Sequence, residues 1–500
     1  MRDRLARLPL LIWLMALGAV AMLLPAGHAL GLGDFRTARI FLYGAVLSGF
    51  LTGLIGLATT GPAPRSAPRS QLLTLLAAFG LLPLMFAIPF YEAADRTTVL
   101  QAWFEMVSSF TTTGATLYDN AGQLNPTLHL WRALVGWMGG LLVWITATAI
   151  LAPLNLGGFE VRTQAAAGDG WHRVTHLHAD GSPAARLLRV TLVLAPLYAA
   201  LTLGLWTLLV IAGEVPFVAL CHAMGILSTS GISPVGGVQY ATAGVTGEVV
   251  MALFLVFALS RLSFCLGLDR VGWRTLWRDP EWRLGLSIVL FVTVMLVLRP
   301  LLSGGGQGSA GPAIWGGFFT LLSFLTTTGY ESELWLATKD WAGLPAPGLI
   351  LLGLALIGGG VATTAGGVKL LRIHVLLQHG RRELERLVHP NSVSGGSGVS
   401  RQVRRQAAVM AWVFFMLFAL SVLAVMLALS LTGLQFEPAM VLTISALTNT
   451  GPLAEVAAEN PVAFAGIPDM AKVILAATMV LGRLETLALV ALFNPGFWRS

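Results

Sequence analysis

Residues 102–115 read AWFEMVSSFTTTGA, and the same fourteen-residue pattern occurs three more times without a gap. The other copies are ALCHAMGILSTSGI at residues 219–232, GFFTLLSFLTTTGY at 317–330 and AMVLTISALTNTGP at 439–452. Each copy runs from an apolar stretch through hydroxyl- or amide-bearing residues to one glycine at position 13 of the pattern. A membrane-spanning helix needs about 20 apolar residues, so these shorter apolar stretches predict re-entrant segments.

The spacing of the copies predicts one membrane unit per copy. Successive glycines of the pattern lie about 100 to 120 residues apart, too far for a small solenoid repeat. Irregular backbone at membrane depth is tolerated only where protein covers it or where it lines a water-filled path. Four such segments can close a ring around a single pore, and rings of backbone carbonyls can replace the water shell of a potassium ion.

Composition indicates a polytopic membrane protein rather than a soluble enzyme, because 56% of the 500 residues are hydrophobic and only 11% are charged. The net charge of +7 arises from arginines in alternate loops, such as Arg65 and Arg381, while acidic residues concentrate in the opposite loops. The positive-inside rule then places the N-terminus in the cytoplasm, and no nucleic-acid motif accompanies the basic residues. The acidic loops, with Asp119, Glu331 and Glu455, would concentrate cations at a pore mouth.

Hydrophobic windows predict an all-α membrane protein with ten spanning helices, at about residues 8–30, 39–60, 71–90, 130–152, 187–212, 246–268, 283–301, 347–376, 407–432 and 470–493. The short segments follow the third, fifth, seventh and ninth spans, which gives four helix–re-entrant loop–helix repeats of one orientation, with pseudo-fourfold symmetry around one pore. The predicted organisation is two extra N-terminal helices in residues 1–62 and pore repeats in 70–155, 183–270, 280–380 and 402–500. The first span also resembles a signal peptide, but nine further spans favour a retained helix.

The candidate ion-binding residues are the glycine and the two residues before it in every copy. They are Thr112, Thr113 and Gly114; Thr229, Ser230 and Gly231; Thr327, Thr328 and Gly329; and Asn449, Thr450 and Gly451. Glycine allows the backbone angles that turn successive carbonyls toward an axis. Neutral oxygens suit a weakly hydrated monovalent cation, whereas carboxylates would indicate a divalent metal. Small polar residues also line ordinary helix contacts in membranes, which is the alternative for any single copy.

These glycines and their setting resemble the superfamily of Trk, Ktr and HKT potassium transporters, and most closely its TrkH branch, which has two additional N-terminal helices. The resemblance covers essentially the whole chain and implies that the four glycines belong to a selectivity filter. Sodium-preferring plant relatives carry serine at the first of these positions, so Gly114 implies selection of potassium. The resemblance also implies a homodimer in the bacterial inner membrane, surrounded by lipid, with a cytoplasmic nucleotide-binding regulatory subunit of the TrkA type.

The eighth predicted span contains LIGGGVATTAGGVKLLR at residues 356–372, and so many glycines disfavour a continuous helix. A broken helix beside a cavity is the usual membrane solution. The stretch resembles the family's gating loop, often GGxxGSTxGGxK, although residues 361–365 depart from that pattern. The implied gate residues are Gly358, Gly359, Gly360, Thr363, Thr364, Gly366, Gly367 and Lys369. Close helix packing through small residues is the alternative.

Arg483 lies in the sequence LGRLE, well inside an apolar stretch, where an ionisable residue is costly and is by default functional. The resemblance places this arginine in the pore below the filter, as an electrostatic barrier to resting cations. The alternative is a structural ion pair with a buried carboxylate. Glu105, in the first copy of the pattern, is a further candidate partner for a buried arginine.

The sequence therefore predicts a potassium uptake protein with no catalytic chemistry, because it contains no nucleophile–base motif and no phosphate-binding loop. No cofactor is expected in this chain, since no GxGxxG lies on a strand–helix unit, and potassium is the substrate. A sodium-permeable member of the same family and a secondary transporter of a small organic solute remain alternatives. Flux could be channel-like or coupled to protons or sodium, as in symport. His172, His176 and His178 could bind metal, but no second cluster or cysteine joins them, so a solvated loop is the favoured interpretation.

Overall fold

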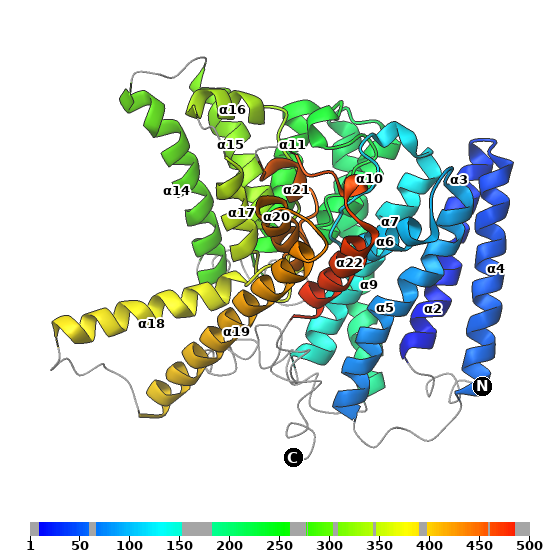
Figure 1. The fold of residues 1–500 in the computed structure, drawn as a ribbon, viewed down its shortest axis with the longest axis horizontal. Helices are drawn as coiled ribbons and strands as arrows, with labels where there is room; N and C mark the ends of the chain where they lie inside the picture. The colour runs from blue at the N-terminus through cyan, green and yellow to red at the C-terminus, as the bar shows by residue number, and fades with distance from the viewer. Residues whose placement is uncertain are drawn as a thin grey trace.

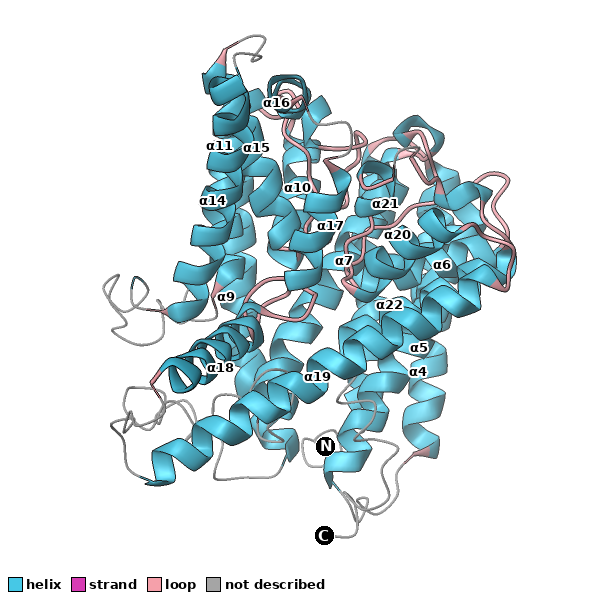
Figure 2. Ribbon diagram, turned by 60° about the vertical axis from the view of Figure 1, so that its left-hand side comes forward, coloured by secondary structure: helices cyan, strands magenta, loops and turns pink. Residues whose placement is uncertain are grey.

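The computed structural model describes residues 10–59, 67–152, 183–260, 277, 279–303, 309–343, 347–389, 398–458 and 461–485. Across these residues the chain forms helices and loops without a strand (Figure 2). Seven of the helices in this part of the chain are long and apolar enough to cross a membrane. The predicted all-helical membrane fold is confirmed.

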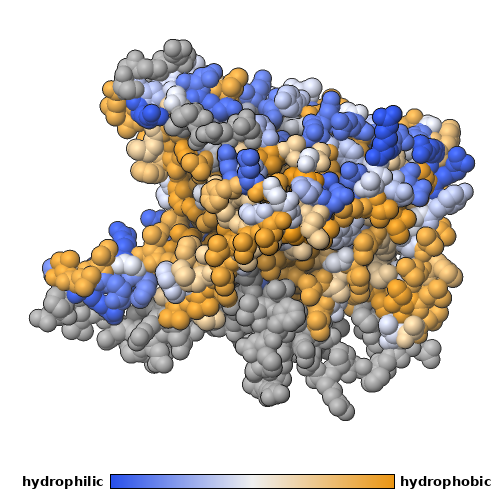
Figure 3. All heavy atoms as spheres, viewed as in Figure 1, coloured by the Kyte–Doolittle hydropathy of each residue, from blue (hydrophilic) through white to orange (hydrophobic). Residues whose placement is uncertain are grey.

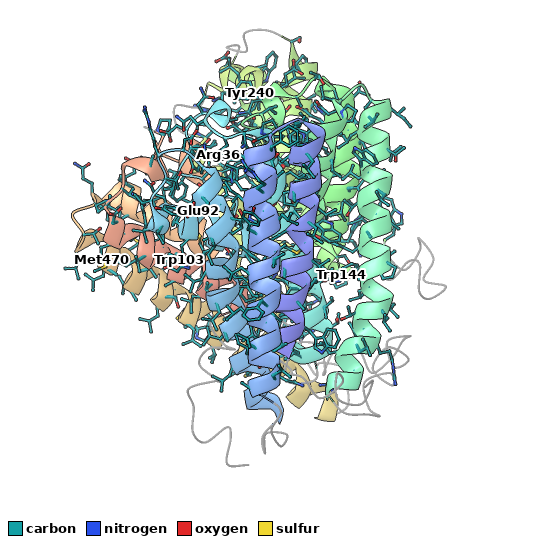
Figure 4. All side chains as sticks on the ribbon, turned by 90° about the vertical axis from the view of Figure 1, so that its right-hand side faces the viewer. Arg36, Glu92, Trp103, Trp144, Tyr240 and Met470 are labelled. Carbon is teal, nitrogen blue, oxygen red and sulfur yellow. The ribbon has the colours of Figure 1, made fainter. Side chains whose placement is uncertain are left out.

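The two N-terminal spans form a separate helical pair at one side of the bundle. Helices α2 (Leu10–Ala21) and α3 (Leu23–Gly31) make one span, and α4 (Phe35–Ala58) returns beside it. Asp34 begins α4, because its carboxylate accepts a hydrogen bond from the Thr37 backbone N–H at 3.0 Å. The pair packs on the first pore repeat through α2 and α5, as Figure 4 shows from that side.

Each pore repeat contains one spanning helix, one short helix and a second apolar helix. Repeat 1 has α5 (Ala67–Ala93), α6 (Val99–Phe110), and α7 (Pro126–Thr146) continued by η2 (Ala147–Leu151). Repeat 2 has α9 (Pro183–Ile211), α10 (Pro216–Ser228), and α11 (Gly244–Leu255) continued by η5 (Val256–Leu259). Repeat 3 has α14 (Pro280–Ser303), α15 (Ala310–Leu325) and α17 (Gly348–Ile357), and repeat 4 has α19 (Gly398–Ser430), α20 (Phe436–Leu447) and α22 (Asp469–Leu484).

The remaining short elements lie in the connections, and α18 (Leu370–Val388) follows the third repeat. They are η1 (Ala121–Gln123), η4 (Val238–Tyr240), α16 (Trp335–Ala342), α21 (Leu453–Val456) and η6 (Phe464–Gly466). The short helices α6, α10, α15 and α20 have 12, 13, 16 and 12 residues, too few to cross a bilayer. They lie in the upper half of the bundle in Figure 1, as expected for re-entrant segments entering from one side.

The repeats close into a ring. The second apolar helix of each repeat packs against the short helix of the next: α7 on α10, α11 on α15, and α17 on α20. The last contact, α22 on α6, returns to the first repeat. A chain of like contacts that ends where it began is a closed cycle, which agrees with the predicted pseudo-fourfold arrangement.

The surface of the bundle is suited to lipid. Large apolar side chains such as Phe50 on α4, Leu192 on α9, Phe291 on α14 and Leu423 on α19 are more than half exposed, at 66%, 66%, 64% and 64%. Figure 3 shows hydrophobic residues over the middle of one face and hydrophilic residues along its upper edge. Such a belt is costly in water and favourable in a bilayer. The chain is therefore a multi-pass membrane protein.

The window predicted as a single span at residues 347–376 does not form one helix. Helix α17 ends at Ile357, a loop occupies residues 358–369, and α18 then leaves the bundle at its lower left in Figure 1. The break begins at Gly358, whose φ of 74° a helix cannot accommodate. Hydropathy alone overestimated this span, whereas the glycine content correctly indicated the break.

Candidate functional site

The structure brings the four glycine-containing segments together at the axis of the ring. In every copy the residue at position 11, immediately after the short helix or one residue beyond it, adopts a left-handed backbone. The φ angles are 54° at Thr112, 51° at Thr229, 58° at Thr327 and 54° at Asn449. A positive φ is unusual for any residue other than glycine and rare for threonine. Four such residues at one position show that the segments share one fold.

The glycines at position 13 are required by the neighbouring segment as well as by their own backbone. The φ angles of Gly114, Gly231 and Gly329 are 74°, 65° and 84°. A Cβ atom on Gly114 would lie 1.8 Å from the carbonyl oxygen of Ser230, and one on Gly231 would lie 2.2 Å from that of Thr328. Each segment therefore closes against the next, and a side chain would displace a neighbouring carbonyl.

The fourth segment closes the ring with a different geometry. Gly451 does not share the positive φ, and its backbone N–H donates a hydrogen bond of 2.6 Å to the carbonyl of Thr113. Asn449 donates from Nδ2 to Thr113 Oγ1 and to the Met479 carbonyl, both at 2.9 Å. The ring is thus fourfold in its path but not in its detail.

Hydroxyls at position 7 of the pattern anchor the segments from behind. Ser108 donates to the carbonyl of Ala115 at 2.6 Å, and Ser445 donates to that of Thr450 at 2.9 Å. In repeat 3, Ser323 accepts a hydrogen bond of 2.7 Å from the backbone N–H of residue 330. All three serines are buried. This role was not predicted from the sequence, although the shared position in three copies was a visible signal.

A buried ion pair anchors the first segment. Glu105, at position 4 of the pattern, pairs with Arg132 of α7 at 2.9 Å, with 0% and 5% of their side chains exposed. Its other oxygen accepts hydrogen bonds from the Leu117 N–H at 2.5 Å and the Thr116 hydroxyl at 3.0 Å. Glu105 therefore does pair with a buried arginine, but the partner is Arg132, which hydropathy reasoning had not singled out.

The same position 4 is used in two further repeats. His222 Nε2 lies 2.9 Å from Ser233 Oγ, and Thr320 Oγ1 accepts a hydrogen bond of 3.1 Å from the Ser332 N–H. In each case a polar residue of the short helix holds the chain just beyond the glycine. These contacts fix the outer ends of the segments to the surrounding helices.

Above the glycines lies an acidic vestibule. The cavity is lined by Gly114, Gly231 and Gly329 on its floor side and by the acidic residues Asp119, Glu331 and Glu455. Burial raises the pKa of Glu331 above its ordinary value. Desolvation in the vestibule also raises the pKa of Glu455, and the nearby Asp119 raises it further. The negative charges of Glu331 and Glu455 are therefore lost at a higher pH than those of ordinary glutamates.

Below the glycines the loop of residues 358–369 contacts three of the four segments. The Gly366 N–H donates to Thr327 Oγ1 at 2.7 Å, and the Thr364 hydroxyl donates to the Leu227 carbonyl at 3.2 Å. A Cβ atom on Gly366 would lie 1.9 Å from the carbonyl of Thr448. The loop thus lies directly against the inner side of the ring.

The other proposed gate residues shape this loop. Gly358 and Gly367 have φ angles of 74° and 77°, and Lys369 has one of 84°. The Gly360 N–H donates to a carbonyl of η5 at 3.1 Å, and the Thr363 hydroxyl donates to the Gly360 carbonyl at 2.8 Å. Gly359 is also closely packed within the loop, since a Cβ there would lie 2.5 Å from the Ala365 side chain. Lys369 Nζ donates back to the Ala365 carbonyl.

Arg483 reaches the loop from the last helix. Its Nη1 donates to the Thr364 carbonyl at 2.7 Å, and the residue is 7% exposed. Within the described part of the chain its Nε and Nη2 have no hydrogen-bond partner. The neighbouring carboxylate of Glu485 pairs instead with Arg372, at 2.6 Å. The alternative of a structural ion pair at Arg483 is therefore not what the described residues form.

Two features of the sequence lie outside the described residues. These are the tract of His172, His176 and His178, and Arg261, a charged residue inside the sixth predicted span. Among the residues that the structure describes, no group of histidine, cysteine and carboxylate side chains could hold a metal ion.

Comparison with known proteins identifies the family of the chain. Residues 287–499 match the family model TrkH, described as a cation transport protein. The chain is 32% identical to the Trk system potassium uptake protein TrkH of Escherichia coli K12 over 85% of this chain and 84% of that one. It is 28% identical to TrkG of the same organism, over 84% and 83%.

A solved structure agrees over the whole length. The crystal structure of the potassium transporter TrkH from Vibrio parahaemolyticus superposes with a TM-score of 0.82, with 27% identity and 100% of both chains covered. These relatives are transporters rather than enzymes. The ring of repeats, the paired N-terminal helices and the sequence relationship lead to one assignment: the chain belongs to the TrkH family of cation transport proteins.

Proposed function

We propose that this chain takes up potassium through a filter formed at the ring axis by residues 112–114, 229–231, 327–329 and 449–451. The observation that carries the proposal is the left-handed residue at position 11 in all four segments, followed two residues later by a glycine closed against its neighbour. In this proposal, backbone oxygens of the four segments face one axis. Uncharged oxygens can replace the water of a monovalent cation and still release it.

The surroundings of the filter favour a cation. The C-terminal ends of α6, α10, α15 and α20 point at the segments, and the end of a helix carries partial negative charge. The vestibule adds Asp119, Glu331 and Glu455 on the outer side. Both effects raise the occupancy of cations at the filter without placing a full charge in it.

Gating is assigned to the loop of residues 358–369 together with Arg483. The loop lies against the inner side of three of the four segments, and in this proposal it must move for ions to pass. Its polar contacts to the ring are the hydrogen bonds of Thr364 and Gly366, each worth about 1 kcal/mol. The guanidinium of Arg483 adds a positive charge at the same level, where a low dielectric amplifies repulsion of cations.

The remaining expectations stand as parts of the same proposal. They are a bacterial inner-membrane location with a cytoplasmic N-terminus, lipid around the apolar belt and a homodimer. A cytoplasmic nucleotide-binding subunit of the TrkA type would regulate the loop, so the chain itself needs no cofactor and no nucleic acid. The pore repeats are assigned to residues 70–155, 183–270, 280–380 and 402–500, after the helical pair in 1–62.

The direct test is uptake in a bacterium that lacks its own potassium transporters. Expression of this chain should restore growth on low potassium, and more strongly when a TrkA-type subunit is co-expressed. Purified protein in liposomes should pass potassium or rubidium in preference to sodium. Equal sodium and potassium fluxes would favour the sodium-permeable alternative. Accumulation of an organic solute with no cation flux would contradict the proposal.

A further inference from the structure

The second filter segment lacks the hydroxyl that anchors the other three. Position 7 of the pattern is Ser108, Ser323 and Ser445 in repeats 1, 3 and 4, but Gly225 in repeat 2. In repeat 1 this serine donates to the carbonyl at position 14, the residue directly after the glycine. The equivalent carbonyl in repeat 2 belongs to Ile232, and no side chain of its own short helix can reach it from position 7.

A tyrosine from repeat 3 supplies the missing bond. The hydroxyl of Tyr330 donates to the carbonyl of Ile232 at 2.8 Å, across a sequence separation of 98 residues. Ala115 receives the same kind of bond in repeat 1, at 2.6 Å from Ser108. Two different side chains thus donate a hydroxyl hydrogen bond to equivalent carbonyl oxygens in two repeats.

The glycine and the tyrosine are sterically complementary. A Cβ atom on Gly225 would lie 2.4 Å from the Tyr330 hydroxyl oxygen and 3.1 Å from the Ile232 carbonyl oxygen. A serine at position 225 and a tyrosine at position 330 therefore cannot both fit. If the phenolic oxygen were absent, the nearest atom to a Cβ at position 225 would be the Ile232 carbonyl oxygen at 3.1 Å, so a serine would fit after a shift of a few tenths of an ångström. Its hydroxyl would then stand beside the carbonyl that is equivalent to the one Ser108 reaches in repeat 1.

Tyr330 is held at both ends. Its backbone N–H donates to Ser323 Oγ at 2.7 Å, and its ring meets that of His222 edge to face at 5.6 Å. The residue is 2% exposed. A side chain fixed in this way has little freedom to lose when its hydroxyl makes the bond, so the bond can define the position of the carbonyl.

We propose that Tyr330 is a positioning residue of the filter: its hydroxyl takes the role of the missing serine in repeat 2 and couples the second segment to the third. Without it the peptide after Gly231 is free to turn, and the oxygens of that segment no longer hold the spacing that suits potassium. The inference rests on the proposed filter function. It assigns selectivity to a residue that is not one of the proposed ion-binding residues.

The test compares three variants with wild type in liposomes, using potassium and sodium fluxes. Tyr330→Phe keeps the ring and removes the hydroxyl, and it should raise sodium flux relative to potassium by about fivefold, the equivalent of one net hydrogen bond. Gly225→Ser alone should impair folding or flux, because its Cβ collides with the tyrosine. The double variant Gly225→Ser/Tyr330→Phe should recover selectivity, because the serine hydroxyl replaces the phenol.

Two controls separate positioning from general packing. Ser108→Ala removes the equivalent bond in repeat 1 and should reduce selectivity by a similar factor. Tyr240→Phe removes a tyrosine hydroxyl from a side chain that is 68% exposed at the upper end of the molecule (Figure 4), and it should leave selectivity unchanged. Membrane expression and thermal unfolding in detergent are measured for every variant.

The outcomes are distinct. The positioning role is overturned if Tyr330→Phe has the selectivity of wild type. It is also overturned if Tyr330→Phe loses selectivity and the double variant does not regain it. If Tyr330→Phe does not accumulate, the double variant decides: selective flux supports the inference and its absence overturns it. A wild-type protein that passes no potassium contradicts the proposed function itself, and the inference with it.

Discussion

The filter ring and the loop beneath it are built on opposite principles. The ring repeats one backbone path four times, and its glycines approach neighbouring carbonyls so closely that a single carbon atom would not fit. The loop of residues 358–369 occurs once, in repeat 3, and it touches the ring through the hydrogen bonds of Thr364 and Gly366 and through one close backbone contact at Gly366. A part that must discriminate between ions by size benefits from rigidity, whereas a part that must open needs contacts that can be broken. Changes in the ring should therefore alter selectivity, and changes in the loop should alter rate.

The largest effect is expected from Gly114→Ser. The new Cβ would lie 1.8 Å from the Ser230 carbonyl oxygen, and the residue would need to keep a φ of 74°. A residue strained in this way costs about 1–3 kcal/mol, and about 1.4 kcal/mol of this cost acting on the bound ion gives a tenfold loss of preference for potassium over sodium. Relative fluxes in liposomes measure it. Gly49→Ser on α4 is the matched control, because nothing lies within 4 Å of a Cβ at that glycine. Unchanged selectivity in Gly114→Ser would contradict the filter assignment.

Deleting residues 363–365 tests the loop, as Gly114→Ser tests the ring. The deletion removes the Thr364 hydroxyl, which donates to the Leu227 carbonyl. It also removes the Thr364 carbonyl, which accepts a hydrogen bond from Arg483. We expect potassium flux to rise several-fold while the ratio of potassium to sodium flux stays at the wild-type value. Single-channel or liposome flux recordings would decide between this result and a fall in membrane insertion, which would favour a packing role for the loop.

Arg483→Ala is expected to raise potassium flux by a smaller factor, about twofold to fivefold, because it removes one charge and one hydrogen bond while the loop remains. Expression should stay near normal, since no carboxylate of the described residues is left unpaired. Arg372→Ala is the matched comparison. This substitution removes the ion-pair partner of Glu485 and should lower the free energy of unfolding by about 3–5 kcal/mol. If Arg483→Ala is poorly expressed and shows no gain in flux, Arg483 has a structural role rather than a gating role.

The smallest effect is expected from the acidic vestibule, which belongs neither to the ring nor to the loop. The pKa values of Glu331 and Glu455 are raised, so these groups take up protons at a higher pH than ordinary glutamates. Acidifying the outer solution from neutral should therefore remove negative charge and lower potassium flux by about twofold, since salt screens such charges. Glu331→Gln/Glu455→Gln should flatten this pH dependence without changing selectivity. A pH profile identical to wild type would show that the two carboxylates do not steer cations.

Much of the site was predictable because the deciding features are local and repeated. The four glycines, the polar residues before them and the short apolar stretches can be read in any one copy, and the agreement of four copies removes chance. Arg483 was predictable for a similar reason, since a charge in an apolar stretch is conspicuous. Its contact with the Thr364 carbonyl, by contrast, joins residues 119 positions apart, and no pattern in the chain pairs them.

The sequence by itself determined the class of the protein, the number of repeats, their common orientation and the place of the break in the third repeat. Those properties follow from hydropathy, charge and glycine content, which act over short stretches of chain. Tertiary structure decided which neighbour each glycine faces, that Glu105 pairs with Arg132, and that Tyr330 completes the second segment in place of a serine at Gly225. These are contacts between segments distant in the chain, and they depend on which helices the closed ring brings side by side.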